Sequence, residues 1–265
     1  MFTIHESPAK PLVNRGALQL AEGDLDSAEA LFREALTVDP ANATAHGNLG
    51  FLLACRGRHG EAIAEADEAI ALEPQRSAPW AHRGMSLVAT GRVDDGLTSL
   101  SRAVRLDPQN HFAWDAMGRT LLALGRPDEA EIAWASAVAA QPDDADLLIS
   151  LATALAAQDR TTEAVRVLHR AVTVAPRSPR AWVQLGVVSL VRQDHGTAGE
   201  ALLQALDLDP RNEEARYHLA LLHVLVGALD EAREVFAELA GGQGGWATEA
   251  TAMLERLSGD SRRLG

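Results

Sequence analysis

The chain has 265 residues, of which 47% are hydrophobic, 4% are aromatic and one is a cysteine. Its formal net charge of −13 argues against binding to DNA or RNA, which needs a basic surface, and against an anionic membrane surface. A single cysteine, Cys55, excludes an internal disulfide.

The N-terminal residues MFTIHESPAK have neither the basic flank nor the apolar run of a signal peptide. No stretch of about 18 uninterrupted apolar residues occurs, so the sequence predicts no membrane span. We therefore expect a cytoplasmic protein.

A regular series of prolines reveals an internal repeat. The series is spaced by 34 residues and consists of Pro40, Pro74, Pro108, Pro142, Pro176 and Pro210. Six of the eleven prolines at one fixed interval indicate a repeat rather than chance. With the proline at position thirty-two, the seven predicted repeats are 9–42, 43–76, 77–110, 111–144, 145–178, 179–212 and 213–246.

Residues 1–8 form a short lead-in, and repeat one then predicts two helices over about 10–21 and 27–38. Gly23 stands where a left-handed C-cap is needed, as do Gly57, Gly91, Gly125 and Gly227. Asp26 and Glu29 have the spacing of a capping box at the start of the second helix. Position thirty-four predicts the N-cap of the next repeat's first helix, through Asn42, Asn110, Asp144, Ser178 and Asn212, with Arg76 as the exception.

The two ends of the array depart from the pattern. Arg15 and Gln19 replace the apolar residues that most other repeats have at positions seven and eleven, which predicts that repeat one is its own polar cap. The alternative is that this end docks on another chain. At the other end, the glycine-rich run 241–245 ends the regular array, 246–257 predicts a capping helix, and 258–265 predicts a disordered tail. Repeat five also departs, with Leu148, Ala152 and Asp159 at positions four, eight and fifteen.

Small residues fill positions eight, twenty and twenty-seven in nearly every repeat, and position four carries Trp80, Trp114 and Trp182. These columns, the period and the closing proline together resemble the tetratricopeptide (TPR) repeat over residues 9–246. The resemblance implies an all-α fold, a right-handed TPR solenoid of antiparallel helix pairs with a C-terminal capping helix.

In the TPR family, a second stripe on the first helix of each repeat lines the concave surface and holds ligands. In this chain that stripe is mostly apolar, which predicts a groove for a peptide or an amphipathic helix, although part of it could pack against the adjacent first helix. Position six adds polar side chains, interrupted by Ala116 and Ser150, that form either a ladder for a peptide backbone or a row of solvated residues. The candidate groove residues are Asn14, Asn48, Phe51, His82, Met85, Arg119, Ile149, Gln184, Val187, Tyr217 and His218.

Nothing in the sequence supports catalysis. The nine histidines form no HExxH motif, and Cys55 has no evident base, so we expect no metal, no cofactor and no enzyme activity. The sequence favours a non-enzymatic scaffold that binds a protein or peptide partner in its concave groove. The alternatives are a self-assembling homo-oligomeric scaffold and the recognition or regulatory subunit of a separate enzyme.

Overall fold

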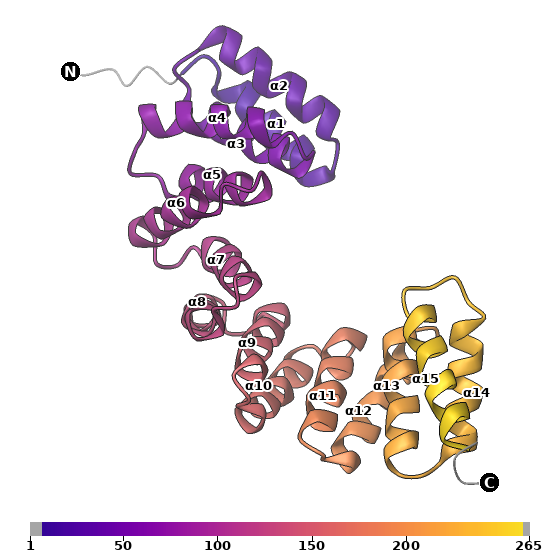
Figure 1. The fold of residues 1–265 in the computed structure, drawn as a ribbon. Helices are drawn as coiled ribbons and strands as arrows, with labels where there is room; N and C mark the ends of the chain where they lie inside the picture. Colours follow the sequence, from indigo (N-terminus) through magenta and orange to yellow (C-terminus); the bar gives the residue numbers. More distant parts are fainter. Residues whose placement is uncertain (1–6, 262–265) are drawn as a thin grey trace. The chain divides into compact units, whose positions relative to one another are not determined.

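The computed structural model describes residues 7–261, with side chains to residue 258, and this part of the chain contains helices and no strands. It confirms the all-α fold class, a TPR solenoid of helix pairs (Figure 1). The helices fall into two compact units, an N-terminal unit of residues 1–141 and a C-terminal unit of residues 142–265. None of the described helices is both long enough and apolar enough to cross a membrane.

Each repeat contributes a first helix and a second helix that pack against each other. The helices of the N-terminal unit are α1 (Lys10–Glu22), α2 (Leu25–Val38), α3 (Ala43–Cys55), α4 (His59–Leu72), α5 (Ser77–Ala89), α6 (Val93–Leu106), α7 (His111–Ala123) and α8 (Pro127–Ala140). The helices of the C-terminal unit are α9 (Ala145–Ala157), α10 (Thr161–Val174), α11 (Pro179–Val191), α12 (His195–Leu208), α13 (Glu213–Leu225), α14 (Leu229–Ala240) and α15 (Ala247–Ser261).

In repeats one, three, four and six, the glycine at position eight of the first helix lies against the side chain at position twenty-four of the second helix. A Cβ built on Gly118 would lie 2.6 Å from the Trp134 ring, and one built on Gly16 would lie 2.6 Å from the Phe32 ring. Phe32 and Trp134 are almost completely buried. A glycine therefore makes room for a large aromatic ring between two closely packed helices.

A hydrogen bond to the closing proline links successive repeats. The indole Nε1 of Trp80, Trp114 and Trp182 donates to the carbonyl oxygens of Pro74, Pro108 and Pro176 at 3.0, 3.0 and 2.9 Å. In repeat two, His46 Nε2 lies 3.0 Å from the Pro40 carbonyl oxygen.

Repeat five lacks a donor at position four, because Leu148 stands there, and the guanidinium of Arg170 in α10 donates to the Pro142 carbonyl instead. The carbonyl at this repeat boundary is therefore satisfied from a different helix, which the sequence pattern did not predict.

The predicted N-caps of the first helices are confirmed. The side chains of Asn42, Asn110 and Asn212 accept hydrogen bonds from the backbone N–H groups three residues later at 2.9–3.0 Å. Asp144 and Ser178 cap their helices in the same way, and Arg76 makes no cap hydrogen bond.

The capping box expected from Asp26 and Glu29 is wrong. Asp24 is the N-cap of α2, accepting a hydrogen bond from the Ser27 backbone N–H at 3.1 Å. Glu29 therefore lies too far along the helix to bond the N-cap backbone N–H. Its carboxylate instead forms ion pairs with Arg56 and Arg58 of repeat two.

The turn between the two helices of a repeat requires a left-handed residue. The five glycines predicted for this role all have positive φ, between 70° and 84°. In repeats five and six the same place is taken by Asp159, with φ 61°, and Gln193, with φ 62°. Those two turns keep the left-handed conformation without glycine, the residue that adopts it most easily.

The C-terminal end is closed by α15, which packs on α14 through Ala250, Met253, Leu254 and Leu257. The helix continues to Ser261, so the prediction of a disordered tail from residue 258 is wrong for residues 258–261. Extending an existing helix costs far less than starting one, which accounts for the extra turn. Residues 262–265 of the expected tail, and residues 1–6 of the lead-in, lie outside the described residues.

Candidate functional site

The first helices of the N-terminal unit bring five of the predicted groove residues together. Asn48 and Phe51 on α3, His82 and Met85 on α5, and Arg119 on α7 line one cavity of about 340 Å³. Asn14, the remaining candidate in this unit, is exposed on α1 and does not line the cavity. We call this surface the α3–α7 groove.

The floor and walls of the α3–α7 groove are largely apolar. Besides Phe51 and Met85, the apolar residues Ala78, Ala81 and Phe112 line it. Phe51 is 37% exposed and Phe112 is 69% exposed, whereas phenylalanine side chains in folded proteins are most often buried. Exposed aromatic rings beside a hollow provide the type of surface on which an apolar side chain of a partner gains most from burial.

Phe51 also positions the imidazole of His82, since their ring centroids are 4.9 Å apart. Burial lowers the pKa of His82 to about 4, and a hydrogen bond with the Gly47 backbone opposes the shift only in part. The ring is therefore neutral at pH 7. Its Nδ1 atom is buried without a hydrogen-bond partner among the described residues.

Next to Phe112, the α7 side of the groove carries two charged side chains, Asp115 and Arg119. Asp115 accepts a hydrogen bond from Trp134 Nε1 at 2.9 Å and forms an ion pair with Arg119, whose Nε lies 3.3 Å from Asp115 Oδ2. The Arg119 side chain is 63% exposed, so its guanidinium retains free donors that face solvent. This side can pair with a carboxylate or with backbone carbonyl groups.

A second hollow extends the groove along α5 and α7. It has a volume of about 280 Å³ and shares Met85 and Arg119 with the first. Its other lining residues are Val88, Ala89, Ala116, Thr120 and Ala123. The two hollows form a surface longer than a single side chain requires.

The polar series at position six is divided among different environments. Asn48 and His82 line the α3–α7 groove, whereas Gln184 in the C-terminal unit donates to Glu214 Oε1 at 3.2 Å. His218 packs on Trp246, with ring centroids 5.4 Å apart, and burial lowers its pKa. The function of this series as a peptide ladder stays a prediction.

Ile149 is a wrong assignment, because its side chain is only 2% exposed and offers no surface to a ligand. Position five is also buried at Val13, Ala81 and Val183. The alternative interpretation of the stripe, packing against neighbouring helices, therefore holds for Val13, Ile149 and Val183, whereas Ala81 and Asp115 at the same position line the α3–α7 groove.

The other candidates in the C-terminal unit are partly covered by the chain itself. Val187 is half-buried in a cluster with Val183 and Leu202. The Tyr217 ring lies 4.7 Å from the ring of Trp246, at the start of the capping segment. Closing the end of the array thus takes up surface that the sequence pattern had assigned to a partner.

The candidate set omitted five residues that line the α3–α7 groove, namely Ala78, Ala81, Asn110, Phe112 and Asp115. Phe112 and Asp115 occupy positions two and five of repeat four, in the same stripe as the residues that were chosen. The signal available in the sequence was a large aromatic residue, Phe112, at the second residue of a predicted helix. In the described part of the chain, no three His, Cys, Asp or Glu side chains are grouped as metal ligands would be.

Two family profiles match the sequence. The profile described as cilia and flagella-associated protein 70 C-terminal domain matches residues 6–188, and a tetratricopeptide repeat profile matches residues 192–245. Because the first match spans more than half of the chain, the chain belongs to the tetratricopeptide repeat family, in the group that this profile describes. Proteins of this fold are scaffolds for protein–protein interaction. No curated protein sequence matches the chain.

Solved structures of similar fold are numerous. PilW, described as a widely conserved type IV pilus biogenesis factor, superimposes with a TM-score of 0.72 at 16% identity, over 81% of this chain and 99% of that chain. Pseudomonas aeruginosa pilF gives 0.68 at 20% identity, over 80% and 96%. YrrB, described as a TPR protein with an unusual peptide-binding site, gives 0.57 at 21% identity, over 69% and 95%. These likenesses establish the fold.

Proposed function

We propose that the protein is a non-enzymatic scaffold that binds a partner peptide or amphipathic helix in the α3–α7 groove. The observation that carries the proposal is the meeting of Phe51, His82, Met85 and Arg119 from three successive repeats around one cavity. Side chains that lie far apart in sequence thereby form one apolar surface with a polar edge. YrrB, which has a similar fold, is described as having a peptide-binding site, which supports the proposal.

The chemistry of the groove favours a segment that combines apolar and acidic residues. The apolar side chains would cover Phe51 and Phe112, and a carboxylate would pair with the exposed Arg119 guanidinium. A neutral His82 adds no positive charge to the floor at pH 7. An apolar partner side chain can therefore approach it without desolvating a cation.

Selection from a displayed peptide library against the full chain provides the test. Peptides that bind the wild type are measured against Phe51→Ala and Met85→Ala, which should each weaken binding about tenfold because they remove aromatic or flexible apolar contact area. The matched control is Ile132→Ala on α8, whose side chain is 64% exposed outside the groove. If both groove variants bind the selected peptides as well as the wild type does, the proposal is wrong.

A further inference from the structure

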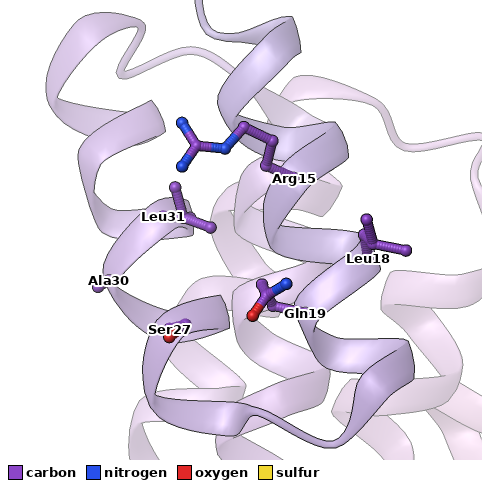
Figure 2. Close-up of a pocket in the computed structure, with 6 residues that line it drawn as sticks. All are labelled: Arg15, Leu18, Gln19, Ser27, Ala30 and Leu31. Atoms are coloured by element: carbon purple, nitrogen blue, oxygen red, sulfur yellow. The ribbon is translucent and has the colours of Figure 1, made fainter.

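The outward ridge of α1 is a second unpartnered surface, separate from the α3–α7 groove. Pro11, Arg15, Leu18 and Glu22 are all exposed, and their spacing places them in one row along the helix. Leu18, at the centre of the row, is 57% exposed. Beside the ridge is a hollow of about 440 Å³ between α1 and α2, lined by Arg15, Leu18, Gln19, Ser27, Ala30 and Leu31 (Figure 2).

The same face is covered in other repeats. The residues equivalent to Leu18, at position ten, are at most 7% exposed in Leu52, Thr120, Val188 and Leu222. In these repeats the second helix of the preceding repeat packs against the first helix, as α2 does on α3, α6 on α7, α10 on α11 and α12 on α13. On α1 the helices that pack are α2 and α3, and the face around Leu18 is exposed in the described part of the chain.

One covered repeat shows which chemistry an arginine at this place requires. Arg83 is the position-seven equivalent of Arg15, and its Nε lies 2.6 Å from Asp67 Oδ1 on the covering helix α4. An arginine at position seven thus pairs with a carboxylate of the helix that packs on it. No ion pair holds Arg15 within the described part of the chain. The open face therefore calls for a helix that carries an apolar residue and a carboxylate.

The α1 ridge itself has this pattern. Leu18 is flanked by a cation, Arg15, three residues before it and by an anion, Glu22, four residues after it. Glu22 is held on the helix surface by Gln19, whose Nε2 donates to Glu22 Oε2 at 2.8 Å. If two such ridges pack antiparallel, leucine meets leucine at the centre, and each arginine lies opposite a glutamate. The charge pattern is therefore self-complementary under a two-fold axis.

We propose that the α1 ridge binds the α1 ridge of a second copy of this chain, forming a two-fold dimer through Arg15, Leu18 and Glu22. The contact is small and has a polar rim, so it gives a weak dimer that forms as the protein concentration rises. A helix from a different protein would fill the hollow without needing this symmetric charge pattern.

Sedimentation velocity of the full chain over a concentration series up to about 1 mM tests the proposal. The wild type should show monomer–dimer exchange. Arg15→Glu and Glu22→Arg should each raise the dissociation constant at least tenfold, because each places like charges opposite one another. The double variant Arg15→Glu/Glu22→Arg restores opposite charges in both pairs and should recover the wild-type dissociation constant.

Leu18→Asp should abolish the dimer, and Leu203→Asp on α12, where the leucine is 56% exposed, serves as the matched control that leaves it unchanged. Circular dichroism of each variant checks that the helices remain folded. A wild type that stays monomeric throughout the series would overturn the proposal. So would a dimer that survives Leu18→Asp, or single charge variants that the double variant does not rescue.

Discussion

Nη1 of Arg58 lies 2.8 Å from Oε1 of Glu29, joining repeat two to repeat one. Arg56 Nη1 lies 2.6 Å from the other oxygen, Oε2, and Arg33 Nη2 lies 2.9 Å from Oε1. The Glu29 side chain is only 12% exposed, so one carboxylate is held among three guanidinium groups. Burial on its own raises the pKa of Glu29, but the hydrogen bonds from Arg33 and Arg58 outweigh it, and the net shift is downward.

Glu29→Gln should destabilise the N-terminal unit by about 1–2 kcal/mol, because it leaves partly buried guanidinium groups without their anion. Since the pKa of Glu29 is lowered on folding, its contribution is present above the ordinary value of 4.5 and is lost as the pH falls through the folded value. Urea denaturation at pH 7 measures the loss. The control is Glu61→Gln, because Glu61 also pairs with Arg58 but has a side chain that is 55% exposed. Equal losses in both variants would contradict this account.

His82 should make the stability of the N-terminal unit depend on pH. Its pKa is about 4 in the folded chain and 6.5 without the burial, so between these values the unfolded chain binds more protons. Stability therefore falls as the pH is lowered from 6.5 toward 4, with a slope that approaches about 1.4 kcal/mol per pH unit. His82→Asn, which places at position six the residue found in repeats one and two, should reduce this slope in urea titrations at pH 7 and pH 5. An unchanged slope would show that other groups cause it.

Gly118→Ala should destabilise the pair of α7 and α8. The new Cβ would lie 2.6 Å from the Trp134 ring, which is buried and hydrogen-bonded to Asp115 and so cannot move freely. Overpacking costs about 1–3 kcal/mol and exceeds the gain of up to about 1 kcal/mol from replacing glycine in a helix.

Gly60→Ala in α4 is the matched control, since a Cβ there has no atom within 4 Å. Only the gain in helix propensity then remains, and thermal unfolding should show a stabilised variant. A Gly118→Ala variant as stable as Gly60→Ala would contradict the proposed contact.

Gln193→Gly should stabilise the C-terminal unit. Gln193 has a φ of 62°, a left-handed conformation that costs a residue with a side chain about 1–2 kcal/mol. The greater flexibility of glycine in the unfolded chain offsets part of this, which leaves a gain of about 0.5 kcal/mol. Asp159→Gly should change stability less, because aspartate tolerates the conformation better. Chemical denaturation of the two variants side by side compares these gains, and the reverse order would argue against the explanation.

The fold could be predicted from the sequence because the repeat places its strongest signals at local positions. Asn42 and Asn110 mark helix starts, and Gly23 and Gly125 mark left-handed turns, each through chemistry within a few residues. Seven copies of one pattern also reveal which residues must be small. Such features depend little on how distant parts of the chain meet.

The candidate site was only partly predictable, because exposure depends on what lies over a residue. Phe51 and Ile149 both belong to the apolar stripe, but one is 37% exposed and the other 2% exposed. Membership of the stripe alone does not distinguish an exposed side chain from one packed between first helices. Tyr217 illustrates the same point, since the chain's own Trp246 takes the place beside it.

The indole-to-proline hydrogen bonds between repeats join residues only six positions apart, as in Trp80 with Pro74 and Trp182 with Pro176. Closing so short a loop costs little conformational entropy and takes far less time than bringing distant helices together. Each boundary can therefore fix the direction of the following helix while most of the chain is still unfolded. Folding could then begin at several repeat boundaries at once and spread to the neighbouring helices, without depending on a single nucleus.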